Sequence, residues 1–142
     1  MEVQKIMSAK PISISGEESA AVAARLLSRH NIGALPVCSR EGKLRGIVTD
    51  RDIVLRCIAP GEDPKHTPVS DIMTRRLVWV DSRDSCDTAA RLMASRQIRR
   101  LPVQENGRLV GMVSLGDLAK LRDFSTEAAE ALSEISENIR NL

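Results

Sequence analysis

Aromatic side chains are nearly absent from this sequence. Its 142 residues include one Trp, one Phe and no Tyr. A core must then be built from aliphatic side chains and Met, and the aromatic platforms that usually bind single-stranded nucleic acid are missing. Basic and acidic residues nearly balance, at 21 against 19, which does not indicate a polyanion binder. We therefore expect no nucleic-acid partner.

Long apolar runs and paired cysteines are also lacking. No window approaches the roughly 18 consecutive apolar residues of a membrane span, and the N-terminus does not resemble a signal peptide. Cys38, Cys57 and Cys86 lie far apart with no CxxC spacing, which disfavours a disulfide framework or a zinc site. We expect a cytoplasmic protein with no membrane partner and no required cofactor or metal.

Motifs that would support catalysis are missing as well. Gly42-Lys43 lacks the upstream glycine and the following hydroxyl residue of a P-loop, and neither GxGxxG nor HExxH occurs. His30 and His66 are isolated, and no nucleophile has an obvious base partner in the sequence. We expect a binding protein and not an enzyme.

What the sequence does contain is an internal repeat. A shift of 66 residues, from Ile6-Met7 to Ile72-Met73, superposes the first half of the chain on the second. After a one-residue gap in a loop, the matches continue to Asp52 and Asp117. The densest matches are Ala23-Ala24-Arg25-Leu26 with Ala89-Ala90-Arg91-Leu92, and Leu35-Pro36-Val37 with Leu101-Pro102-Val103. The chain is two copies of one unit.

Each copy is predicted to run strand, helix, strand, strand, helix. Helical spacing relates Ala20, Ala24 and Leu27 in the first copy, and Cys86, Ala90 and Met93 in the second. Ser19 and Ser85 are candidate N-caps, and Asn106-Gly107 is a strong hairpin signal. The expected ranges are 12–14, 19–30, 34–37, 44–49 and 50–58, and then 78–80, 85–96, 100–103, 109–114 and 115–122.

These elements predict an α/β (α+β) fold of two pseudo-symmetric β-α-β-β-α motifs packed sheet to sheet, because neither copy alone has enough apolar surface. We expect the first motif at residues 1–60, a linker at 61–68, the second motif at 69–122 and a C-terminal amphipathic helix at 123–142. That helix either covers the protein's own surface or packs on a second subunit. Its apolar face would contain Ala128, Leu132, Ile135, Ile139 and Leu142.

The residues at the end of each hairpin identify a family. Leu-Pro-Val followed by Gly-x-Val-[Thr/Ser]-x-x-Asp occurs in register within residues 32–53 and 98–118. Both stretches resemble the CBS motif, and the resemblance spans roughly residues 3–122, closest to small bacterial proteins made of two CBS motifs. It implies a tandem CBS (Bateman) module that binds an adenosine-containing ligand in the cleft between the copies. AMP, ADP, ATP, NAD and S-adenosylmethionine are the candidates.

Two acids are the candidate ribose ligands. Asp52 and Asp117 lie three residues after Thr49 and Ser114, at the step from a strand to a helix. Such an acid can accept hydrogen bonds from both ribose hydroxyls, while the hydroxyl residue adds a polar contact. The alternative is that Thr49 and Ser114 cap the helix, with each acid near its positive dipole end. Both interpretations can hold together.

Ile47 and Met112 precede these hydroxyl residues by two positions and so share their strand face. The family resemblance implies that this position packs against the adenine. The alternative is that both are ordinary core residues.

An arginine pair distinguishes the two copies. Arg99-Arg100 stands in the second copy where the first has Gly33-Ala34. A guanidinium binds phosphate oxygens bidentately, and the resemblance implies that such residues serve the site whose acid lies in the other copy. We therefore pair Arg99 and Arg100, with help from Arg51, with Thr49 and Asp52, and expect the Asp117 site to be the poorer phosphate binder. The alternative is a solvated surface pair.

The leading hypothesis is a regulatory nucleotide-binding module that signals to a protein partner not identified by the sequence. The alternative is a ligand-independent structural or interaction protein with degenerate CBS sites. We also expect a homodimer, because the tail helix offers an apolar face and pairs of CBS motifs commonly assemble into discs.

Overall fold

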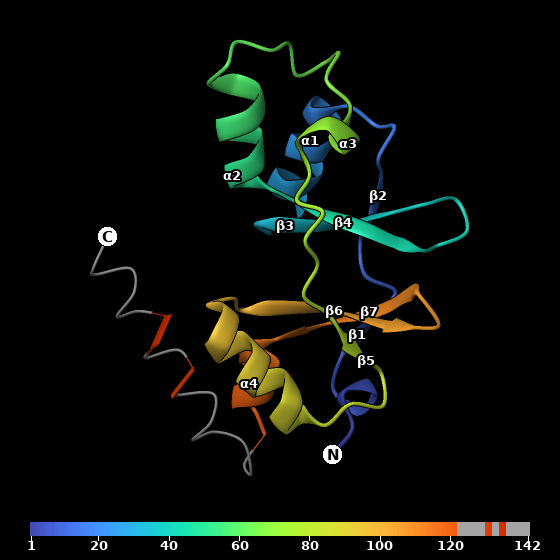
Figure 1. Ribbon diagram of the computed structural model, residues 1–142, viewed down its shortest axis with the longest axis vertical. Coiled ribbons are helices and arrows are strands. Elements are labelled where there is room, and N and C mark those ends of the chain that lie inside the picture. The colour runs from blue at the N-terminus through green and yellow to red at the C-terminus, as the bar shows by residue number, and fades with distance from the viewer. Residues whose placement is uncertain (122–129, 132–133, 136–142) are drawn as a thin grey trace. The chain divides into compact units, whose positions relative to one another are not determined.

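The computed structural model describes residues 1–121, 130–131 and 134–135. The first copy forms a three-stranded sheet in the order β2-β3-β4, with its helices on one side (Figure 1). Strand β3 pairs in parallel with β2 and antiparallel with β4. Its elements are β2 (Ile14–Ser15), α1 (Ala20–His30), β3 (Ala34–Cys38), β4 (Leu44–Thr49), α2 (Asp50–Ile53) and the π-helical η2 (Val54–Ile58), and α3 (Val69–Ile72), from the start of the second copy, packs with them.

The second copy repeats this order in a four-stranded sheet, β1-β7-β6-β5. The predicted fold class, with two β-α-β-β-α copies, is confirmed. Helix α5 is shorter than expected, and Arg122, its predicted end, lies outside the described residues. The elements are β5 (Val80–Asp81), α4 (Cys86–Arg96), β6 (Arg100–Glu105), β7 (Arg108–Ser114) and α5 (Leu115–Ala119), and the same unit includes η1 (Val3–Lys5) and β1 (Ser8–Ala9) from the start of the first copy.

The predicted helix starts are confirmed. The Ser19 hydroxyl accepts a hydrogen bond from the Val22 amide at 3.2 Å. The Ser85 hydroxyl accepts one from the Thr88 amide at 3.1 Å. Each bond satisfies an amide that has no partner inside the helix, so α1 and α4 begin at equivalent places.

The predicted buried face of α1 needs one correction. Ala20, Ala23 and Leu27 are buried, whereas Ala24 is exposed. At about 100° per residue, the stripe is centred near Ala23 and Leu27, which leaves Ala24 beyond its edge. In α4 the predicted residues Cys86, Ala90 and Met93 are all buried.

The hairpin turn of the second copy follows the prediction. Asn106 and Gly107 have φ values of 51° and 80°, and positive φ at both central residues is what the tight β6–β7 turn requires. The ladder that follows pairs Pro102 with Met112 and Arg100 with Ser114. The turn therefore sets which side chains lie together at the end of the sheet where β7 leads into α5.

Each copy's leading segment pairs with the last strand of the other copy. Ser8 in β1 pairs with Met112 in β7, and Thr74 forms an isolated bridge with Ile47 in β4. The chain accordingly divides into two compact units, residues 12–77 and residues 1–11 with those from 78 onward. Each unit has its own aliphatic core between helices and sheet.

The C-terminal segment contributes to the core of the second unit. Ala131 and Ile135 are helical and buried there. For these two residues, the tail covers the surface of its own chain, as one of the two hypotheses expects. The other residues predicted for its apolar face, Ala128, Leu132, Ile139 and Leu142, lie outside the described residues. Among the helices described, none is long and apolar enough to cross a membrane.

Candidate functional site

In the first copy, Thr49 and Asp52 are joined by two reciprocal hydrogen bonds at the end of β4. The Asp52 amide donates to the Thr49 hydroxyl at 3.0 Å, and the Thr49 amide donates to the Asp52 carboxylate at 3.0 Å. This reciprocal pair is a capping box that starts α2. Asp52 is only 7% exposed. The capping alternative is therefore correct for Thr49, and it leaves the ribose interpretation of Asp52 open.

Two residues that sequence reasoning missed also contact Asp52. The Thr74 hydroxyl lies 3.2 Å and 3.3 Å from its two carboxylate oxygens. Arg56 Nε is 4.0 Å from Asp52 Oδ1, and Arg56 Nη1 donates to the carbonyls of Ile72 and Met73. Asp52 thus joins β4, η2 and the segment after α3, and a ligand would have to share its carboxylate with these partners.

The second copy builds the same capping box with fewer partners. The Asp117 amide donates to the Ser114 hydroxyl at 3.0 Å, and the Ser114 amide donates to Asp117 Oδ2 at 2.9 Å. Asp117 is half-buried. Among the described residues, its other carboxylate oxygen has no hydrogen-bond partner. The acid of the second copy is therefore less committed to the fold than Asp52.

Ile47 and Met112 lie on the sheet face away from the helices. Along β4, half-buried Ile47 and Thr49 alternate with buried Val48, which belongs to the core. Met112 and Ser114 alternate in the same way around Val113. Neither Ile47 nor Met112 belongs to the core of its unit. Each lies beside the hydroxyl residue of its own copy, as predicted.

The arginine pair lies beside the strand end that carries the hydroxyl residue of its own copy. Both Arg99 and Arg100 are exposed. Arg100 is directly opposite Ser114 in the β6–β7 ladder, and the Arg99 carbonyl accepts from the Leu115 amide at 2.8 Å. In the first copy, Ala34 takes the place opposite Thr49. Arg51, also exposed, follows Thr49 by two residues. That Arg99 and Arg100 bind the phosphate of a ligand at the Asp52 site stays a prediction.

Comparison with known proteins bears on this arrangement. A family model described as the CBS domain matches residues 3–58 and again residues 69–123. The CBS domain-containing protein YhcV of Bacillus subtilis (strain 168) is 42% identical over 134 residues, which are 94% of each chain. Hypoxic response protein 1 of Mycobacterium tuberculosis is 36% identical over 115 residues, 81% of this chain and 80% of that protein.

Solved structures of CBS-domain proteins also match this chain. The crystal structure of Hypoxic Response Protein I with two coordinated zinc ions has a TM-score of 0.78 at 34% identity, covering 84% of this chain and 98% of that one. The CBS domain pair of protein MJ0100, in complex with 5-methylthioadenosine and S-adenosyl-L-methionine, has a TM-score of 0.73 at 31% identity, with coverage of 84% and 98%. In the described part of this chain, no three His, Cys, Asp or Glu side chains are grouped to hold a metal ion.

Proposed function

Because the chain belongs to the CBS-domain family, we propose that it acts as a regulatory binding module for an adenosine-containing nucleotide. The observation that carries the proposal is the duplicated arrangement at the ends of β4 and β7. In each, an acid that is hydrogen-bonded to a hydroxyl residue lies near an apolar side chain on the sheet face away from the helices. AMP, ADP, ATP and S-adenosylmethionine are the ligands to test, and the MJ0100 complex supports this choice.

Each group has a chemical role in the proposal. Asp52 and Asp117 accept hydrogen bonds from ribose hydroxyls, which a carboxylate can do with two oxygens. Ile47 and Met112 cover one face of the adenine ring. Thr49 and Ser114 add a polar contact, and Arg51, Arg99 and Arg100 bind phosphate oxygens.

Calorimetric titration of the full chain with this panel tests the proposal. We expect binding of at least one adenosine ligand, and a weaker affinity in Asp52→Asn or Asp117→Asn. Asp71→Asn is the matched control, because Asp71 is exposed on α3. Absence of binding at millimolar ligand, in a protein that is folded by circular dichroism, would contradict the proposal.

The same titration assigns the arginine pair. If Arg99 and Arg100 serve Asp52, as the sequence predicts, Arg100→Gln weakens the site that Asp52→Asn weakens. If they serve Asp117, whose capping residue Ser114 is opposite Arg100 in the ladder, the loss follows Asp117→Asn. The uncommitted oxygen of Asp117 supports the second assignment, because a ribose would not have to displace an existing partner there.

Regulation requires that the ligand bind one arrangement of the protein better than another. We propose that this difference is transmitted to a protein partner in the cytoplasm and that the chain performs no catalysis itself. A ligand-independent interaction protein is the alternative. Retention of the capped acid in both copies favours ligand binding, and a partner captured equally well with and without nucleotide would favour the alternative.

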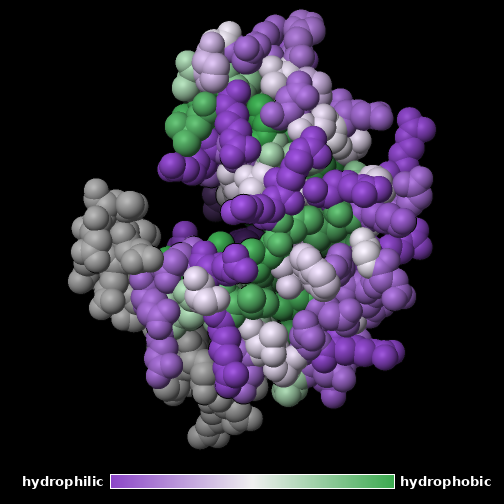
Figure 2. All heavy atoms as spheres, in the orientation of Figure 1, coloured by the Kyte–Doolittle hydropathy of each residue, from purple (hydrophilic) through white to green (hydrophobic). Residues whose placement is uncertain are grey.

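We also propose a homodimer, for which the chain offers an exposed apolar surface. Val54, Leu55 and Ile58 on η2 are 54%, 49% and 52% exposed, and apolar side chains gather over this segment in Figure 2. A π-helix is uncommon and is often found at functional sites. Light scattering should show a dimer for the natural chain and a monomer for Leu55→Glu. A natural chain that is monomeric at micromolar concentration would contradict the proposal.

A further inference from the structure

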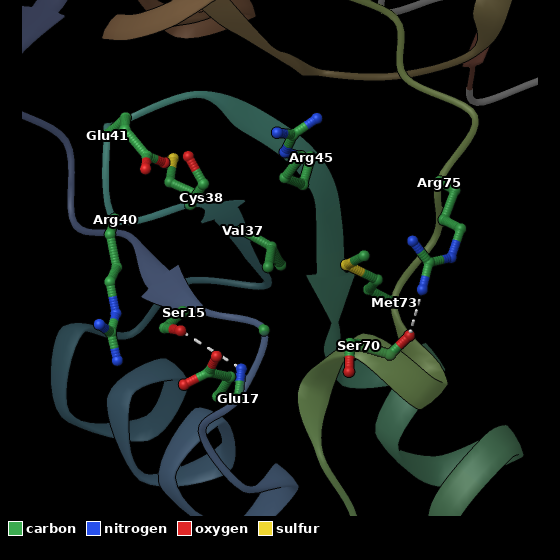
Figure 3. Close-up of a pocket in the computed structure, with 12 residues that line it drawn as sticks. Ser15, Glu17, Val37, Cys38, Arg40, Glu41, Arg45, Ser70, Met73 and Arg75 are labelled. Atoms are coloured by element: carbon green, nitrogen blue, oxygen red, sulfur yellow. Dashed lines mark hydrogen bonds between the residues drawn. The ribbon is translucent and has the colours of Figure 1, made fainter.

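A solvent-open cavity lies at the other end of the first sheet, away from Thr49 and Asp52. It has a volume of about 370 Å³, and all its lining residues belong to the unit of residues 12–77. Val37 and Met73 form an apolar floor, and both are buried. We call it the hairpin pocket (Figure 3), and its remaining lining residues are Ser15, Gly16, Glu17, Cys38, Ser39, Arg40, Glu41, Arg45, Ser70 and Arg75.

The walls of the hairpin pocket are fixed by backbone contacts. The Ser70 amide donates to the Gly16 carbonyl at 2.9 Å, and a Cβ on Gly16 would lie only 3.3 Å from Ser70 Cβ. Between the lining residues Met73 and Arg75, Thr74 exchanges two backbone hydrogen bonds with Ile47 of β4, of 2.9 Å and 2.7 Å, which fix this segment against β4. Backbone hydrogen bonds thus hold together β2, β4 and the segment around α3, the three parts of the chain that surround the pocket.

Three arginines line this pocket. In Figure 3, Arg45 and Arg75 are drawn around Met73, and Arg40 is drawn on the other side, beyond Ser15. Arg75 donates one hydrogen bond, to the Ser70 carbonyl at 3.0 Å, which leaves most of its five N–H groups available. Within the described residues, neither Arg40 nor Arg45 makes a hydrogen bond or an ion pair.

The acids of the hairpin pocket offset only part of this positive charge. The backbone amide of Glu41 and the Ser39 hydroxyl lower the pKa of the Glu41 carboxyl, and Lys43 and Arg45 lower it further. Glu41 is thus already hydrogen-bonded within its own turn. Three guanidinium groups face two carboxylates across the lining, and this excess of positive charge favours an anionic ligand.

The other unit provides an internal comparison, because its matching positions lack the arginines. In the repeat, Ala9 corresponds to Arg75 and Val110 corresponds to Arg45. Ser82, the match of Gly16, is fully buried and donates to the Glu105 carboxylate. The charged pocket is therefore specific to the unit of residues 12–77 and is not a consequence of the repeated fold.

We propose that the hairpin pocket binds a small phosphorylated metabolite, with Arg45 and Arg75 on its phosphate and Arg40 closing the other side. Guanidinium groups bind phosphate oxygens in a fork geometry, and the hydroxyls of Ser15 and Ser70 offer further donors. The site is separate from the adenosine site, since Arg45 and Thr49 stand at opposite ends of β4.

Titration of the ¹⁵N-labelled full chain tests this proposal. The probes are inorganic phosphate, glucose 6-phosphate and glucose. We expect saturable shifts of the Gly16, Ser39 and Ser70 amides with both phosphates and none with glucose. Tighter binding of glucose 6-phosphate than of phosphate would identify an organic phosphate as the ligand, and equal binding would identify the free anion. Both results support the site.

Variants locate the binding. Arg45→Gln and Arg75→Gln should each weaken phosphate binding about tenfold, the effect of losing one charge-assisted contact. Arg29→Gln, an exposed arginine at the end of α1, should have no effect. Asp52→Asn with Asp117→Asn should leave these shifts unchanged, which separates this site from the adenosine site. Shifts that are absent in the natural chain, or equal in Arg45→Gln, would overturn the proposal.

A chemical readout gives a second measurement. Cys38 lines the hairpin pocket and is half-buried, whereas Cys57 and Cys86 are buried. Glucose 6-phosphate should slow alkylation of Cys38 by iodoacetamide in the natural chain but not in Arg45→Gln. Alkylation that is unaffected by the ligand, or slowed as much in Arg45→Gln, would contradict the proposal. If a poly-glutamate peptide protects Cys38 and phosphates do not, the pocket is a peptide site and the proposal is wrong.

Discussion

Replacement of Thr74 by Val should destabilise the first unit through Asp52. The side chains have nearly the same shape, but valine removes the hydroxyl that donates to both carboxylate oxygens of Asp52 at 3.2 Å and 3.3 Å. Asp52 is 7% exposed, so water cannot fully replace the lost donor. A hydrogen bond to a charged group contributes about 1.5–3 kcal/mol, and the free energy of unfolding should fall by that amount.

Urea denaturation followed by circular dichroism measures this loss. The midpoint should fall with little change in the m-value, because the surface exposed on unfolding is the same. For a chain of this size, the melting temperature should fall by roughly 3–10 °C. Ser8→Ala is the matched control, since Ser8 occupies the equivalent position in the repeat and is exposed on β1. A Thr74→Val protein within about 0.5 kcal/mol of the natural chain, the range of a neutral surface substitution, would refute the reasoning.

Three further predictions concern packing, capping and reactivity. Gly46→Ala should lower the free energy of unfolding by about 1–3 kcal/mol through overpacking, because the added Cβ would lie 2.8 Å from the Thr74 carbonyl oxygen. In the control variant Gly33→Ala, the added Cβ would meet no atom closer than 3.9 Å. Urea denaturation should show a far smaller loss for this control. Ser85→Ala should cost about 1 kcal/mol by removing the N-cap of α4, and a neutral result would contradict its capping role. Burial raises the pKa of the Cys38 thiol, so its alkylation rate, followed by mass spectrometry, should rise with pH at higher values than for an unstructured cysteine peptide.

Local patterns predicted much of the fold. The repeat, the caps at Ser19 and Ser85 and the Asn106-Gly107 turn are each determined by residues close together in the chain, so the sequence is sufficient to find them. Strand lengths and the end of α2 were less accurate. The helix after β4 gives way to a π-helix at Val54, for which the apolar pattern contains no signal.

The partners of Asp52 were missed because they depend on tertiary packing. Thr74 follows Asp52 by 22 residues and reaches it only because the segment after α3 pairs with β4. The repeat offered one clue, since Thr74 matches Ser8, but nothing local indicated that either residue pairs with a last strand. Arg56, four residues after Asp52, could have been found from helical spacing. The hairpin pocket was missed for the same reason as Thr74.

Backbone amide shifts on titration with AMP test the central claim most directly. If the capped acids hold an adenosine ligand, AMP should produce saturable shifts at Ile47 and Thr49, at Met112 and Ser114, or at both pairs, and the Asp52→Asn, Asp117→Asn double variant should lose them. No saturable shift at either pair with millimolar AMP, or shifts that persist unchanged in the double variant, would contradict the account.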